Sequence, residues 1–213
     1  EFTQNQFKGM NLTRFLLIDT ALMLVGLPLL LIFQGNKAKV SLLENLNDLA
    51  VGDQTLINLP AQQKLEELEK IARKDGSGIE SDLLIGRWKF FSVWKQGIDK
   101  ENLISSSLLR IFSASLEIEE DRSNQFVITN SIQYGLLSIR FTGAGNLKGK
   151  QPLLPFFLDC IELKVGSSVL FSRSLAIPEE NDRPFFGLIA IEENGKWLSA
   201  RGRGGGLALW VKD

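Results

Sequence analysis

The sequence predicts a mainly β protein, with an antiparallel β-barrel that follows two short helices and an N-terminal transmembrane helix. Three observations lead to this fold class: an apolar run at residues 15–33, two amphipathic segments before residue 83, and a succession of short strand-like segments after it. Eight or nine short strands joined by brief turns are typical of an up-and-down barrel, because closure of the sheet removes its edges.

Four segments follow from this pattern. Residues 1–10 are a polar N-terminal arm, and residues 11–34 are the predicted transmembrane helix. Residues 35–82 hold the short amphipathic helices and a linker, and residues 83–213 form the predicted barrel. The sequence therefore predicts one compact domain attached to a membrane anchor.

The predicted anchor contains the run FLLIDTALMLVGLPLLLIF at residues 15–33. A helix of that length covers roughly 28 Å at about 1.5 Å per residue, close to the thickness of the hydrocarbon core. Pro28 predicts a kink within it. Two alternatives are a secretory signal peptide and a buried core helix, but no small-residue cleavage site follows the run. The first two residues, Glu1 and Phe2, are compatible with a cloning scar or with removal of a leader.

Asp19 is the one charged residue of this run, about one turn inside the predicted membrane segment. Its carboxylate either reaches back to the lipid headgroups or contacts a partner helix or cofactor, since charges within membranes are seldom without a role. Lys8 and Arg14 precede the run, and Lys37 and Lys39 follow it. The positive-inside rule therefore assigns no orientation.

Composition removes several classes of function. The chain has no histidine, which excludes Ser-His-Asp and Cys-His catalysis as well as zinc, haem or chlorophyll bound through histidine. From Leu83 to Asp213 there are 16 Lys and Arg against 14 Asp and Glu, so no basic face for nucleic acid is expected. The single cysteine, Cys160, is expected to be a small core residue. We therefore predict no catalytic residues, no metal site, no enzymatic activity and no nucleic-acid partner.

Two segments before residue 83 have helical patterns. Residues 41–49 begin with Ser41 and Glu44 at capping-box spacing, followed by leucines at helical intervals. Pro60 stands before a second segment, residues 61–72, in which leucine, isoleucine and alanine form one face. A further helical turn is expected at residues 99–105.

Residues after 83 read as strands separated by turn signals. The first strand is expected around Phe90 to Trp94. The others are expected at residues 115–120, 125–133, 136–142, 156–165, 168–176, 185–193, 197–201 and 207–212, with turns at 121–124, 142–146, 165–168, 193–196 and 202–206. Asn194-Gly195 is the strongest hairpin signal in the chain. Residues 151–157 are either the start of a strand or a loop on the membrane surface.

Two motifs concern the barrel ends. Gly86-Arg87-Trp88 resembles the Gly-x-Trp that closes the base of lipocalin-like barrels, where the indole packs under an arginine. Arg201 or Arg203 is the expected partner of Trp88, in a contact worth about 0.5–2 kcal/mol. Residues 201–206, RGRGGG, occur once between strands, which favours a hairpin connection over an RNA-binding tract. The two arginines are also candidates for binding a phosphate or carboxylate of a ligand or partner.

The order of these motifs resembles the plastid-lipid-associated, or fibrillin, family. The resemblance rests on residues 84–94, 126–132, 157–165 and 197–207 and covers residues 41–213. It implies a lipocalin-like fold, an origin in plastids or cyanobacteria, and binding or organisation of isoprenoid and carotenoid-type lipids. The family offers no established catalytic residues. The predicted anchor at residues 11–34 departs from the family, because its members commonly lack one.

Two functions are expected from the anchor and this resemblance. The first is a non-catalytic accessory subunit of a thylakoid photosynthetic complex, such as a photosystem with its antenna, held in the membrane by one pass and in contact with lipid and other subunits. The alternative is a binder or carrier of a carotenoid, quinone or lipid inside the barrel. No cofactor is required, although a carotenoid, chlorophyll or lipid is compatible with either. A hollow apolar interior would favour the carrier, and a filled one the subunit.

Overall fold

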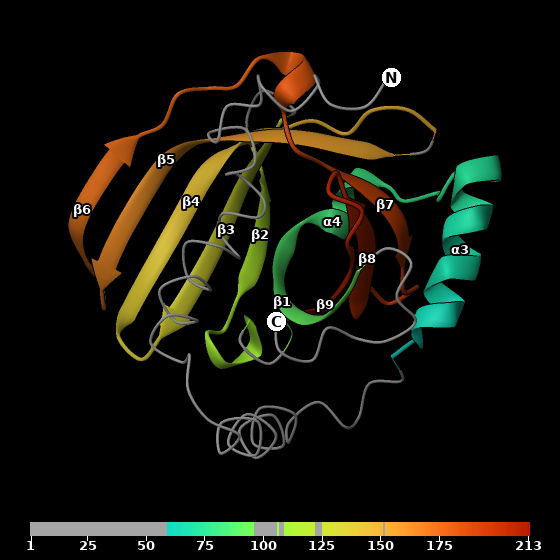
Figure 1. Ribbon diagram of the computed structural model, residues 1–213, viewed down its shortest axis with the longest axis horizontal. Helices are drawn as coiled ribbons and strands as arrows, with labels where there is room; N and C mark the ends of the chain where they lie inside the picture. Colours follow the sequence, from blue (N-terminus) through green and yellow to red (C-terminus); the bar gives the residue numbers. More distant parts are fainter. Residues whose placement is uncertain (1–58, 96–105, 107–108, 122–124, 151) are drawn as a thin grey trace, which may run out of the picture. The chain divides into compact units, whose positions relative to one another are not determined.

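The computed structural model describes residues 59–95, 106, 109–121, 125–150 and 152–213 (Figure 1). The predictions for residues 1–10, 11–34, 41–49 and 99–105 fall outside these residues. Within the described part of the chain, no helix is both long and apolar enough to cross a membrane.

Nine strands, two complete α-helices and one short 3-10 helix make up most of the described fold, and residues 106 and 109–111 are also helical. The helices are α3 (Gln62–Asp75), α4 (Ser81–Leu84) and η1 (Glu180–Asp182). The strands are β1 (Gly86–Trp94), β2 (Ser115–Glu120), β3 (Phe126–Tyr134), β4 (Leu137–Gly145), β5 (Leu153–Val165), β6 (Ser168–Ser174), β7 (Phe185–Ile191), β8 (Trp197–Gly202) and β9 (Leu207–Lys212).

Eight of these strands form a closed antiparallel barrel. The sheet runs β4-β3-β2-β1-β9-β8-β7-β5-β6, and the additional pairing of β4 with β5 closes the ring. The first three residues of β5, Leu153–Pro155, pair with β7, and the later part of β5 pairs with β6 instead. Strand β6 therefore lies outside the closed ring at a free edge, as the left side of Figure 1 shows. The predicted mainly β barrel is confirmed.

The alternation of side chains places a large apolar core inside the barrel. Register pairs such as Trp88↔Leu116 and Phe90↔Trp210 put these four side chains on the inner face. The buried inner side chains include Trp88, Leu116, Ile118, Phe126, Ile128, Phe141, Leu154, Phe156, Leu158, Leu188, Leu198 and Trp210. Burial of this apolar surface is the main term that favours the closed sheet.

A second apolar cluster lies between α3 and the outer face of the barrel. Leu65 of α3 is fully buried against side chains of β1, β7, β8 and β9, namely Trp94, Ile189, Trp197, Leu207 and Leu209. The helix begins two residues after Pro60, close to the predicted position, and it presents one apolar face to the sheet. Figure 1 shows α3 standing beside β7 and β8 on the outside of the barrel.

The glycine-rich segment at residues 142–146 is where the predicted strands were wrong. It was expected to be a turn, but β4 continues through Gly143 to Gly145. A Cβ atom on Gly143 would lie 1.8 Å from the carbonyl oxygen of Phe157, so only glycine allows β5 to approach this closely. The glycines therefore allow β4 and β5 to pair closely around a bulge, and they do not form a turn.

Candidate functional site

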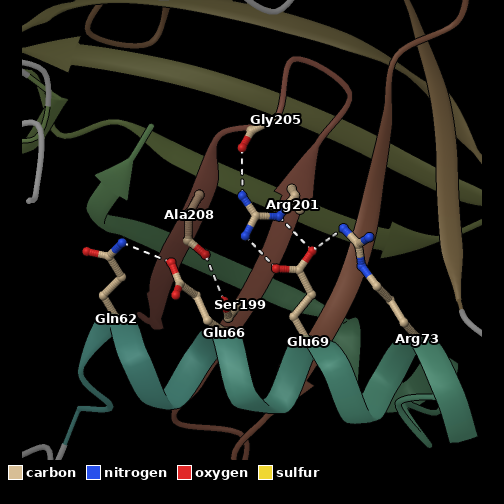
Figure 2. A network of polar contacts seen from close by, with 8 residues as sticks. All are labelled: Gln62, Glu66, Glu69, Arg73, Ser199, Arg201, Gly205 and Ala208. Carbon is tan, nitrogen blue, oxygen red and sulfur yellow. Dashed lines mark hydrogen bonds and ion pairs between the residues drawn. The ribbon is translucent and has the colours of Figure 1, made fainter. Parts of the chain in front are cut away.

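The best-defined polar cluster joins α3 to the barrel (Figure 2). Glu69 on α3 is buried, and both of its oxygens accept hydrogen bonds from Arg201 on β8. The Nε of Arg201 lies 2.6 Å from Oε1 of Glu69, and its Nη2 binds Oε2, which makes a two-pronged pair. The Nη1 of Arg201 donates to the carbonyl oxygen of Gly205 at 2.7 Å. The guanidinium thus connects the helix, strand β8 and the β8–β9 turn.

Two local features complete this cluster. Arg73, one helical turn after Glu69, donates from Nη2 to Oε1 of Glu69 at 2.6 Å. Gln62 donates to Glu66 at 3.0 Å along the same helix. The i, i+4 spacing brings each of these pairs together on the helix surface.

The pKa of Glu69 lies below its ordinary value. Burial alone would raise the pKa of Glu69, but the hydrogen bonds from Arg201 and then Arg73, with the attraction of both charges, outweigh that effect. The carboxylate is therefore ionised at neutral pH and already has two cationic donors. Such a group is suited to linking two elements of the fold, and is poorly suited to donating a proton to a substrate.

The structure separates the predicted site residues. Arg201 is taken up by Glu69, and Arg203 donates from Nη1 to the carbonyl oxygen of Arg183 at 2.8 Å. Asp19, the third candidate, falls outside the described residues. The two arginines therefore do not form a joint anion site in this structure. Sequence reasoning missed Glu69, because its helical segment gave no sign that one acidic residue would be buried.

Trp88 is buried as predicted, but its cationic partner is different. The indole is fully buried, and its Nε1 donates to the carbonyl oxygen of Leu84 in α4 at 2.8 Å. The cation over its ring is the Nζ of Lys212, 5.0 Å from the ring centre. The expectation of Arg201 or Arg203 was wrong, because Arg201 projects from the outer face of β8 toward α3, whereas Lys212 pairs with Trp88 across β9 and β1.

Aromatic side chains occupy the barrel interior on the β5, β7, β9 and β1 side. Phe156 stacks on Phe186 with ring centres 5.0 Å apart, and Phe186 meets Trp210 edge to face at 5.5 Å. Trp210 in turn contacts Phe90 at 6.4 Å. This continuous series of rings crosses the interior from β5 to β1. Edge-to-face and stacked pairs of this kind add about 0.5–1.5 kcal/mol each beyond area burial.

Cys160 is partly exposed and not the core residue that was predicted. It lies in β5 with its sulfur 3.7 Å from the Oγ of Ser172 in β6. Among the residues that the structure describes, no three acidic or cysteine side chains gather as metal ligands would. The expectation of no metal site stays a prediction for the whole chain.

The comparisons add no family to these findings. No protein-family model matches the chain, and no curated protein matches it. The resemblance to the fibrillin family therefore stays a prediction from the motifs. The fold and site define the class of the described domain: a closed eight-stranded antiparallel barrel whose outer face carries a helix fixed by an ion pair.

Proposed function

We propose that this protein is a membrane-anchored, non-catalytic barrel protein of lipocalin-like, fibrillin type that acts as an accessory subunit of a thylakoid photosynthetic complex. The single observation that carries the structural role is the aromatic series inside the barrel, where Phe156, Phe186, Trp210 and Phe90 form one continuous series of ring contacts. The closed barrel and the buried Trp88 at the entry to β1 support the lipocalin-like assignment.

The two arginines that were predicted as anion-binding candidates also support a structural role, because both bind other parts of the protein. Arg201 donates two hydrogen bonds to the carboxylate of Glu69, and Arg203 donates to the backbone carbonyl oxygen of Arg183. A pigment or quinone inside the barrel would have to displace the aromatic rings of the interior. The aromatic lining therefore does not fit such a group. We therefore rank the alternative, a carrier of a hydrophobic ligand, below the subunit.

The membrane and thylakoid parts of the proposal rest on the sequence. The apolar run at residues 15–33 is long enough for one membrane pass. The photosynthetic setting is what the resemblance to the fibrillin family implies. A tethered barrel reaches only partners near the membrane. Such tethering suits a fixed subunit better than a protein that shuttles lipid between membranes.

The test is isolation of the full-length protein from photosynthetic membranes in mild detergent, with identification of the proteins that accompany it. We expect a stable association with a photosystem or antenna assembly, and loss of that association when residues 1–35 are deleted. The control is the fold of the truncated protein, which should keep the near-ultraviolet circular dichroism of a packed aromatic core. Normal assembly of the truncated form, or a full-length protein that purifies as a lone lipid-filled monomer, would contradict the proposal.

A further inference from the structure

Seven of the eleven large apolar side chains that are exposed in the described residues gather at one end of the barrel. Strands β3 and β4 meet at residues 134–137, and β5 and β6 meet at residues 165–168. The two turns are neighbours, because Leu137 pairs with Val165. Figure 1 shows both turns at the lower left, at the same end of the β3–β6 sheet. The exposed apolar residues there are Tyr134, Leu136, Leu137, Val165, Val169, Leu170 and Phe171.

Four of these side chains, those of Tyr134, Leu136, Leu170 and Phe171, are half or more exposed. The side chain of Leu136 is 73% exposed, that of Leu170 is 62% exposed and that of Phe171 is 50% exposed. Contiguous exposed apolar groups of this kind typically mark a surface that contacts a membrane or a partner. Strand β6, which carries three of them, is exposed along its whole length.

A hollow of about 220 Å³ opens on the outer wall beside these turns. Arg140 and Lys164 line it together with Leu136 of the β3–β4 turn and Gly166 of the β5–β6 turn. Its other lining residues are Arg87, Glu117, Ser131, Gln133 and Ser138. The hollow therefore contains three cations, one carboxylate and three neutral hydrogen-bonding side chains, and its rim is continuous with the apolar turns.

Two of the three cations have acidic partners. Arg140 lies 3.4 Å from Glu117, and Arg87 lies 3.5 Å from Asp213. Lys164 has no ion pair among the residues that the structure describes. The hollow thus keeps a positive balance next to the apolar turns, which favours an anionic group.

We infer that this end of the barrel docks on a membrane surface, with the apolar turns among the lipid chains and an anionic lipid headgroup in the hollow at Arg140 and Lys164. Basic residues near an anionic membrane contribute about 1 kcal/mol each, and apolar side chains contribute through burial in the interface. A second copy of this chain is a poorer occupant, because a symmetric contact would bring the same cations face to face.

The inference rests on the proposed membrane attachment but not on any photosynthetic partner. The test uses the full chain in lipid nanodiscs, with Cys160→Ser to remove the native thiol. A fluorophore is placed at Leu136→Cys, and in a matched control at Asn194→Cys, which lies in the exposed β7–β8 turn at the opposite end of the barrel. Quenchers carried by lipid chains and quenchers dissolved in water report the surroundings of each label.

We expect the label at position 136 to be quenched from the lipid in nanodiscs that contain phosphatidylglycerol, and less so in phosphatidylcholine alone. The label at position 194 should be quenched from water in both. Lys164→Ala should lower the docked-to-undocked ratio about fivefold, as for loss of one cation near an anionic surface. Lys196→Ala, in the exposed turn next to Asn194, removes the same charge at the other end and should leave the ratio unchanged.

Three outcomes would overturn the inference. In the first, the label at 136 stays in water in both lipids although the chain is incorporated, which would leave the anchor and the proposed function intact. In the second, inorganic phosphate stabilises the wild-type protein but not the Lys164→Ala variant, without any lipid quenching at 136, which would identify a soluble anion as the ligand. In the third, the label is shielded only in native membranes, which would indicate a protein partner.

Discussion

The pair Glu69 and Arg201 shows how one buried contact fixes the position of a helix. The residues are separated by 132 positions in the sequence, yet their side chains are only 10% and 18% exposed. Water contributes little to the solvation of either charge at this depth. Loss of Glu69 leaves the Arg201 guanidinium with only the carbonyl oxygen of Gly205, and loss of Arg201 leaves the Glu69 carboxylate with Arg73 alone.

Removing one partner should therefore destabilise the protein strongly. We expect Glu69→Ala or Arg201→Ala to lower the free energy of unfolding by about 3–5 kcal/mol, measured by chemical denaturation of the full chain in detergent. The double variant Glu69→Ala with Arg201→Ala should lose less than the sum of the two single changes. The control is Glu67→Ala, because Glu67 forms an exposed pair with Lys64 and should cost below about 1 kcal/mol. Additive effects of the two single changes would show that the pair is not coupled.

The lowered pKa of Glu69 predicts a pH dependence with a definite sign. A carboxyl group whose pKa is lower in the folded than in the unfolded state stabilises the fold above its unfolded value, ordinarily 4.5. That contribution is lost as the pH falls through the folded-state pKa. Between about pH 6 and pH 3, the stability of the wild-type protein should therefore fall more steeply than that of Glu69→Gln. Equal slopes in urea titrations across this range would contradict the assignment.

At the scale of elements, the bulged pairing of β4 with β5 depends on glycine. Gly143→Ala should lower the free energy of unfolding by about 3 kcal/mol, the upper end of overpacking costs, because the new Cβ would meet the backbone of Phe157. Gly204→Ala is the matched control, since nothing lies within 4 Å of its Cβ position. Thermal unfolding of both variants measures the difference. A stable Gly143→Ala protein would show that β4 and β5 can separate here without cost.

The same elements show what the sequence could predict. The bounds of β2 and β9 were predicted correctly, because the polar segment at residues 121–124 follows β2 and the glycine-rich segment at residues 202–206 precedes β9. The end of β4 was missed, since glycine favours turns and its need for close approach depends on a strand that follows later. Helix α4 was also missed, because four residues are too short for a helical pattern.

At the scale of the whole molecule, sequence patterns predicted the barrel but not its polar contacts. The partners of Arg201 and Trp88 depend on which face of its strand each residue occupies after closure, and bulges such as the one at residues 90–92 reverse that face. The positive hollow could not be predicted either, because its lining residues come from five strands, β1 to β5, and the turns between them. Such combinations arise only once the register of every strand is known.

Closure of the ring also predicts an uneven stability across the sheet. Strand β6 pairs on one side only, with β5, and all seven of its residues are exposed. Strand β8 pairs on both sides and four of its residues are buried. We expect the backbone amides of β6 to exchange with deuterium much faster than those of β8 in the detergent-solubilised full chain, measured by mass spectrometry. Equal protection would mean that another surface covers β6.

The pairing between β5 and β7 that closes the ring is short, which suggests how the protein would behave if its chain were cleaved near β7. Three residue pairs close the ring there, whereas six join β9 to β1. A protein cleaved in the exposed connection at residues 175–184 would give one fragment that ends after β6 and another that holds β7, β8 and β9. The smaller fragment would keep its full pairing with β1 and the cover of α3, through the buried contact of Leu65 and the bond from Arg201 to Glu69. The two fragments are therefore expected to stay associated through β1 and α3, with the three-pair joint between β5 and β7 as the weakest contact between them.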